Sequence, residues 1–171
     1  MKIFTYGSNM NINRLKERVP SAIKICNASV EGYKFSFNKR SSVDGSARGN
    51  ILQTNDVTVK VWGVVFEIAE SDKSVLDLVE GLGKGYNEQQ IDLFDDKGNV
   101  VRAQVYIADT RAINNEVLPF DWYKAFVVTG AEQNNLPADY IETLKNTTAK
   151  LDKNVQRNQK QQAILTGIKK P

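Results

Sequence analysis

Four consecutive residues, Tyr6-Gly7-Ser8-Asn9, are suited to hold a small anionic ligand. The stretch follows a β-prone run at 2–5 and precedes Asn11, a residue type that begins helices. A glycine-containing turn from a strand into a helix points backbone N–H groups outward, and these favour a carboxylate or a developing oxyanion. Tyr6, Ser8 and Asn9 add side chains that can form hydrogen bonds. An ordinary strand-to-helix turn is the alternative that this stretch alone leaves open.

Glu80 is a second residue that could do chemistry, because its place is unusual for a carboxylate. Ser71-Asp72 begins an expected helix whose apolar stripe is Val75, Leu78, Val79 and Leu82. Glu80 lies near the end of this helix, where the helix dipole disfavours negative charge, and one turn after Leu76 on the flank of the stripe. Both effects favour the neutral form, as expected of a general base that works near neutrality. A solvated glutamate at a fraying helix end is the equally open alternative.

The composition excludes several other chemistries. The chain has no histidine, so Ser-His and Cys-His nucleophile pairs and imidazole metal sites are excluded, and we expect no metal. Acid–base chemistry must therefore come from carboxylates, lysine, tyrosine or cysteine. The single cysteine, Cys26, cannot form an internal disulfide, and its strand-like surroundings favour a buried, inert thiol. This cysteine usage predicts an intracellular, cytoplasmic protein.

The length of 171 residues predicts one domain, with no apolar run long enough to span a membrane and no signal peptide at the N-terminus. The formal net charge is +3, but basic residues gather in 145–171 and leave the remaining body mildly acidic. We therefore predict a main domain at 1–145 and a basic, Lys/Gln-rich C-terminal tail at 146–171 that is frayed or disordered. The acidic body argues against a nucleic-acid partner, except as an added role of the tail.

The remaining patterns predict an α+β fold. Expected strands are 22–30, 31–38, a central one at 57–68, and a hairpin of 86–94 and 100–108; expected helices begin at 119 and 136, and 39–50 is an expected loop. Gly81, Gly83 and Gly85 follow the helix that ends near Glu80. They therefore face the negative end of its dipole, which favours a C-cap over a phosphate-binding loop.

Seven separated stretches, in order, resemble the γ-glutamylcyclotransferase-like family, also called AIG2-like proteins. They include the YGSNM turn, the GYKFSF strand, the VWGVVF strand and the LVEG helix end, and they span about residues 3–144. The full set is 4–10, 32–37, 49–51, 61–66, 76–81 with 85–86, 123 with 129–131, and 136–140.

The resemblance implies a small mixed β-barrel of about six strands flanked by helices, with a cavity at the first strand-to-helix turn. It also implies a cofactor-free enzyme that cyclises a γ-glutamyl group to 5-oxoproline and releases the attached amino acid or amine. By the same resemblance Glu80 is the catalytic acid/base, the turn Tyr6-Gly7-Ser8-Asn9 cradles the substrate, and Tyr86 and Tyr123 line the cavity.

Two stretches depart from the family pattern. Arg48-Gly49-Asn50 stands where a small residue followed by Ala-Asn is expected, and Phe120 replaces a serine that often follows the residue at Pro119. Arg48 could favour an acidic leaving group. Three alternatives stay open: a γ-glutamyl-amino acid as substrate, a γ-glutamylamine or other γ-glutamyl amide, and a non-catalytic module that binds a small ligand. The oligomeric state is not predicted.

Overall fold

The structure, a computed structural model, describes residues 1–167. Lys169 and Lys170 of the predicted basic tail lie outside the described residues. No helix in the described part of the chain is long and apolar enough to cross a membrane.

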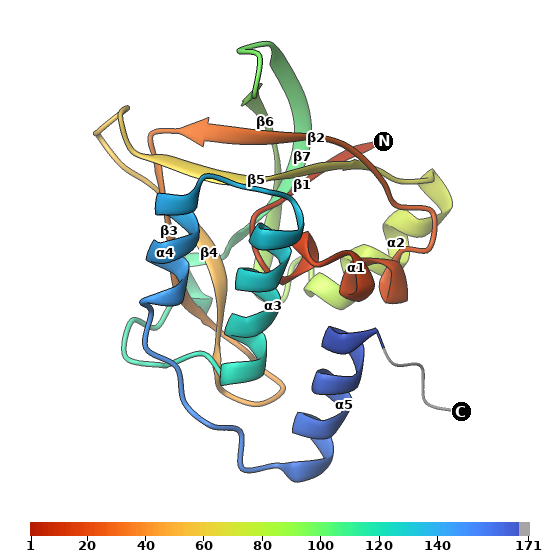
Figure 1. Cartoon of the computed structure of the whole chain (residues 1–171), viewed down its shortest axis with the longest axis vertical. Coiled ribbons are helices and arrows are strands. Elements are labelled where there is room, and N and C mark those ends of the chain that lie inside the picture. The colour runs from red at the N-terminus through yellow and green to blue at the C-terminus, as the bar shows by residue number, and fades with distance from the viewer. Residues whose placement is uncertain (168–171) are drawn as a thin grey trace.

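Five strands close into a barrel in the order β1-β5-β2-β6-β7 (Figure 1). Antiparallel pairs join the neighbours, except that β1 and β7 run parallel where the barrel closes, with Ile3 opposite Gln104. The β-branched strand β5 pairs with both β1 and β2, so the strand predicted at 57–68 is present; in a closed barrel no strand is more central than another. The strands are β1 (Lys2–Thr5), β2 (Ile23–Glu31), β5 (Lys60–Glu67), β6 (Tyr86–Asp95) and β7 (Val100–Ala108).

The two remaining strands, β3 (Tyr33–Arg40) and β4 (Ala47–Gln53), form a separate antiparallel ribbon. The α+β class is therefore confirmed, while the barrel has five strands instead of about six. The predicted loop at 39–50 is wrong at both ends, because Lys39 pairs with Arg48 and Phe37 with Gly49. Residues 47–50 have weak β propensity but are buried or half-buried, and in this case pairing and burial outweigh propensity.

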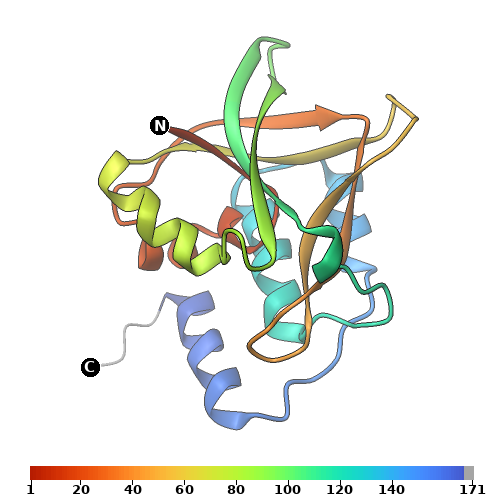
Figure 2. The same cartoon turned by 180° about the vertical axis from the view of Figure 1, so that it is seen from behind.

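Helices cover the barrel and the ribbon, while the tip of the β6-β7 hairpin projects away from them (Figures 1 and 2). The helix predicted from 119 begins at Asp121, and the one predicted from 136 begins at Ala138, directly after Pro137. The helical segments are the 3-10 turn η1 (Ser8–Met10), α1 (Ile12–Arg18), α2 (Glu70–Glu80), the 3-10 turn η2 (Thr110–Ala112), α3 (Asp121–Gln133), α4 (Ala138–Lys145) and α5 (Val155–Thr166).

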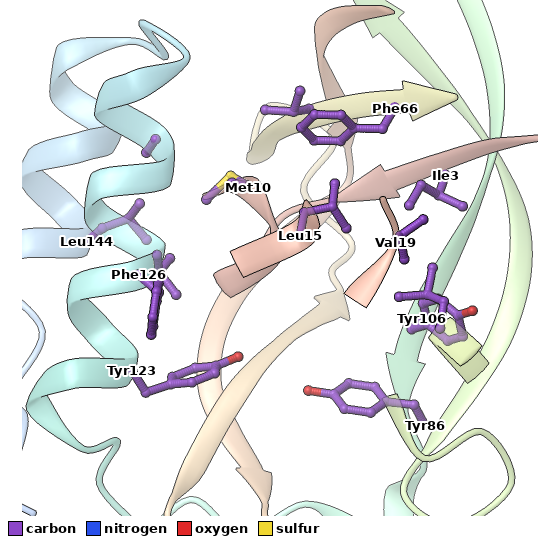
Figure 3. Close-up of a cluster of buried hydrophobic side chains, with 14 of the residues drawn as sticks. Ile3, Met10, Leu15, Val19, Phe66, Tyr86, Tyr106, Tyr123, Phe126 and Leu144 are labelled. Atoms are coloured by element: carbon purple, nitrogen blue, oxygen red, sulfur yellow. The ribbon is translucent and has the colours of Figure 1, made fainter. Parts of the chain in front are cut away.

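Two apolar clusters form the core. One cluster fills the barrel and includes Phe4, Val65 and Val105. The other lies between the barrel and the helices, where Leu15, Phe66 and Phe126 are among the contacts (Figure 3). The second cluster fixes α1 and α3 against the end of β1, and the candidate site lies at this junction.

The predicted apolar stripe of α2 is wrong. Leu76 is buried at 1% exposure, whereas Leu78 is 79% exposed and Val75 and Val79 are also exposed. The helix therefore presents the face of Leu76 to the core, and Glu80, four residues later, lies on that same inward face.

The C-terminal segment does not match the predicted frayed or disordered tail. The helix α5 packs against α1 and α3, and Ile164 and Leu165 contact the core cluster. The segment before it is held by Asp152, whose buried carboxylate accepts hydrogen bonds from Trp122 Nε1 at 2.8 Å and from Arg157. A few apolar residues and one ion pair with a buried carboxylate supply this anchoring. The Gln/Lys-rich composition of the segment therefore gives no sign of it.

Candidate active site

The turn after β1 is a short 3-10 segment that leads directly into α1. The Met10 N–H donates to Gly7 O at 3.0 Å, and Asn11 caps α1 by accepting from the Arg14 N–H at 3.1 Å. The N–H groups of Ser8 and Asn9 come before the first bonded N–H of the turn, so they are not used within it. The predicted strand-to-helix turn is therefore present.

Glu80 faces this turn from the end of α2. Its Oε1 accepts a hydrogen bond from Asn9 Nδ2 at 2.8 Å and forms an ion pair with an Nη of Arg18 at 3.3 Å. The same Arg18 nitrogen donates to Asn9 Oδ1 at 2.9 Å, so the three side chains form a closed set. Gly81 ends the helix in the left-handed conformation (φ 73°), as the predicted C-cap requires, and the chain then turns away from the carboxylate.

The structure brings all the sequence-predicted site residues together around one cavity. Its lining includes Leu76 of α2 and Gly49 of β4 in addition to the predicted set of Tyr6, Gly7, Ser8, Asn9, Glu80, Tyr86 and Tyr123. Of the predicted set, residues 6–9 come from the turn, Glu80 from α2, Tyr86 from the start of β6 and Tyr123 from α3.

Two of the tyrosines hold the backbone of the same residue, Gly49, from opposite sides of the cavity. Tyr86 donates its hydroxyl proton to Gly49 O at 2.6 Å, whereas Tyr123 accepts a hydrogen bond from the Gly49 N–H at 3.0 Å. The two hydroxyl groups point toward one another (Figure 3). Because a phenol has one proton, that of Tyr86 is engaged while that of Tyr123 remains available to a ligand.

Tyr6 has a different environment from these two. Its hydroxyl donates to the carbonyl of Tyr106 at 2.5 Å, so its proton is also engaged. Burial, and after it the nearby Tyr123 and Glu80, raise the pKa of Tyr6, and burial likewise raises the pKa of Tyr86. Both phenols are therefore neutral near pH 7, and they contribute dipoles instead of charge.

Two arginines of α1 complete the site, and the sequence analysis missed them. Arg14 is buried, and its Nε donates to Ser8 Oγ at 3.0 Å while an Nη donates to Gln161 of α5 at 2.8 Å. Burial, and next the charge of Arg18, lower the pKa of Arg14. The spacing of four between Arg14 and Arg18, directly after the turn, places both on one helical face and was the available signal.

The cavity offers hydrogen-bond donors, a carboxylate and positive charge, but no cluster of metal ligands. Among residues 1–167, no group of three or more Cys, Asp or Glu side chains is placed to hold a metal ion. The arrangement can take up a proton at Glu80 and stabilise negative charge near Tyr123 and the turn.

Comparisons with known proteins agree with this fold. A family model described as "AIG2-like family" matches residues 60–144. The human protein named gamma-glutamylcyclotransferase is 30% identical over 145 residues, covering 83% of this chain and 76% of the relative; its mouse counterpart is 31% identical with the same coverage. A solved structure titled "Gamma-glutamyl cyclotransferase" superposes with a TM-score of 0.82 at 26% identity, covering 98% of both chains.

The closed mixed barrel, with a carboxylate facing its first turn, and these named relatives place the chain among small α+β enzymes. The chain belongs to the γ-glutamylcyclotransferase-like family.

Proposed function

We propose that this protein releases 5-oxoproline from a γ-glutamyl-amino acid, with Glu80 as general acid/base. The observation that carries the proposal is the position of Glu80 Oε1, which the amide of Asn9 holds against the turn that lines the cavity. This arrangement places a proton acceptor beside the backbone that would cradle the substrate.

The reaction needs no nucleophile from the protein. The α-ammonium of the γ-glutamyl group gives one proton to Glu80, and the resulting amine attacks the γ-carbonyl carbon of the same molecule. The new C–N bond closes the five-membered ring, and the carbonyl oxygen becomes an oxyanion. The oxyanion then collapses to the lactam carbonyl, the original amide bond breaks, and Glu80 gives its proton to the departing nitrogen. The ring nitrogen holds two protons after the attack and loses one of them, through Glu80, to the released amine, which leaves as an ammonium. The products, 5-oxoproline and a free amino acid, contain all the atoms of the substrate.

The tyrosines have separate tasks in this reaction. Tyr123 has a free hydroxyl proton and already accepts a hydrogen bond from Gly49, so it is suited to donate to the developing oxyanion. Tyr86 has used its proton on Gly49, so its oxygen can accept from the α-ammonium. Tyr6, with its proton on Tyr106, shapes the cavity wall.

The decisive experiment measures 5-oxoproline release from a panel of γ-glutamyl-amino acids and γ-glutamylamines by the wild type and by Glu80→Gln. Because a positioned base contributes about 10²–10⁴ in rate, the variant should lose that factor. Glu70→Gln is the matched control, because Glu70 lies on the same helix with its side chain 80% exposed.

Each outcome of this experiment has a clear meaning. Full activity in Glu80→Gln would exclude Glu80 as the base. No turnover of any panel member by a folded wild type would contradict the proposed reaction. Stabilisation by a γ-glutamyl compound without turnover would then indicate the non-catalytic binding module, since a ligand that binds only the folded form raises its stability.

A further inference from the structure

A buried cation lies directly behind the turn that lines the cavity. Arg14 of α1 is 7% exposed, and its guanidinium lies 4.5 Å from the ring centroid of Phe126. Its Nε donates to Ser8 Oγ at 3.0 Å, and an Nη donates to Gln161 Oε1 at 2.8 Å. Burial, and next the charge of Arg18, lower the pKa of Arg14 to about 9, so the guanidinium is charged near pH 7. Arg14 therefore joins α5 to the turn through two charge-assisted hydrogen bonds.

The hydrogen bond from Arg14 determines how the Ser8 hydroxyl can act. Ser8 lines the cavity, and its Oγ accepts the N–H of the guanidinium, so its own proton remains available to a ligand. A hydroxyl that accepts from a cation is also a stronger donor, because hydrogen bonds in a chain polarise one another. The Ser8 hydroxyl is thus prepared to donate to a ligand oxygen in the cavity.

Gln161 reaches Arg14 from a helix face that is anchored on both sides. Arg157, Gln161, Ile164 and Leu165 follow the spacing of one helical face. An Nη of Arg157 donates to the buried carboxylate of Asp152 at 2.6 Å, and Ile164 and Leu165 contact the core cluster. Gln161 lies between these ionic and apolar anchors, so its amide oxygen is held in place toward α1.

We infer that Gln161 of α5 is a positioning residue of the candidate active site, which acts through Arg14 to orient the Ser8 hydroxyl toward the substrate. The inference rests on the proposed function, which assigns the turn to the substrate. Gln161 does not touch the substrate itself. Without it one end of the Arg14 guanidinium loses its acceptor, and the hydroxyl is no longer fixed. The helix that composition predicts to be a frayed tail is therefore part of the site.

The test is a double-mutant cycle between Gln161 and Ser8, which are joined through Arg14. Gln161→Met removes the acceptor at a similar side-chain volume, and Ser8→Ala removes the hydroxyl. The dissociation constant of γ-glutamyl-alanine is measured by calorimetry on the Glu80→Gln background, and kcat/KM is measured with Glu80 intact. Gln161→Met should weaken binding by about 10-fold when the hydroxyl is present and by less than about 2-fold when it is absent.

Two further variants of α5 separate positioning from a general effect on stability. Gln161→Glu keeps an acceptor oxygen in the same place, so it should bind within about 3-fold of the wild type. Gln162→Met makes the same substitution at the next, exposed residue and should leave binding unchanged. Thermal unfolding shows whether Gln161→Met folds; Gln161→Asn, whose amide is one methylene shorter, is the second variant if it does not.

Equal loss of binding with and without the Ser8 hydroxyl would overturn the inference, because Gln161 would then act by another route. Unchanged binding by a folded Gln161→Met protein would overturn it as well. If Gln161→Met keeps full turnover, the proposed reaction stands and the positioning role does not. Coupled loss of binding in a protein that turns over no γ-glutamyl compound has the opposite meaning. Absence of both binding and turnover would contradict both.

Discussion

The side-chain amide of Asn9 donates a hydrogen bond to Glu80 across 2.8 Å, joining residues 71 positions apart. Asn9 belongs to the turn after β1, and Glu80 ends α2. The contact therefore fixes the candidate base against the turn that would hold the substrate. Arg18 bridges both side chains from α1, so three elements determine where the carboxylate lies.

Replacement of Arg18 by Met should weaken catalysis because it releases Glu80 from its position. One Nη of Arg18 lies 3.3 Å from Glu80 Oε1 and donates to Asn9 Oδ1 at 2.9 Å, so its loss leaves the candidate base less well positioned against the turn. We expect kcat/KM to fall by about 10-fold, mainly through kcat. Arg111→Met, at an exposed arginine paired with Asp109, is the control. An unchanged kcat/KM would show that Arg18 does not position Glu80 for the reaction.

Tyr123→Phe and Tyr86→Phe should have different kinetic effects. Loss of the free proton of Tyr123 removes an oxyanion donor, so kcat should fall by about 10²–10³ with little change in KM. Loss of the Tyr86 hydroxyl removes an acceptor for the α-ammonium, so KM should rise by about 10-fold. Steady-state kinetics with one γ-glutamyl substrate distinguishes the two. Identical effects on kcat and KM in both variants would contradict the division of roles.

Gly130→Ala should disturb the turn from the α3 side. A Cβ at this position would lie 2.5 Å from the backbone nitrogen of Asn11 and 2.7 Å from the carbonyl carbon of Met10. Backbone atoms cannot rotate away, so α3 or the turn must move, at a cost of about 1–3 kcal/mol. Urea unfolding measures the stability, and kcat/KM should fall with it. Glu132→Ala, at an exposed position of the same helix, is the control and should change neither the stability nor kcat/KM by much. A Gly130→Ala protein as stable as the wild type would show that α3 does not pack tightly against the turn.

Asp152→Asn should destabilise the docking of α5 in a pH-dependent way. Hydrogen bonds from Arg157, with smaller contributions from Asn154 and Trp122, lower the pKa of Asp152 to about 2. The unfolded carboxyl titrates near 3.9, so it takes up its proton first on acidification. The stabilisation is therefore fully present above about pH 4 and is lost as the pH falls toward 2.

We expect Asp152→Asn to cost about 1.5–3 kcal/mol of unfolding free energy at pH 7. The difference from the wild type should shrink between pH 4 and 2. Urea unfolding at several pH values measures it. A constant difference across this range would exclude the ionised carboxylate as its source.

Much of the site could be predicted from the sequence because its pieces are local. The turn at Tyr6–Asn9 and the C-cap at Gly81 follow from residue types at short spacing, and the family resemblance added Tyr86 and Tyr123. Hydrophobic periodicity misled on α2, where Leu78 is exposed and Leu76 is buried. Spacing alone predicts that a helix has an apolar stripe, but tertiary packing determines which face of the helix turns inward.

The unpredicted features depend on pairing between distant segments. Gly49 becomes a site residue only because β4 pairs with β3, and its composition favours a loop. The ion pair of Glu80 with Arg18 joins α2 to α1, so a pattern within α2 alone does not reveal it. The anchoring of α5 depends on one buried carboxylate, Asp152, which apolar periodicity does not detect.

The parallel pair of β1 and β7 has a consequence for synthesis of the chain. Ile3 emerges from the ribosome about one hundred residues before Gln104, its partner in the closing register. The turn is completed later still, because the carbonyl of Met10 accepts a hydrogen bond from Asn134 Nδ2 at 3.0 Å. Contacts of such large sequence separation form slowly and leave strand edges open meanwhile. A nascent chain that ends before α3 therefore contains Glu80 and the turn but lacks Tyr123 of the cavity wall and the contact of Asn134 with Met10.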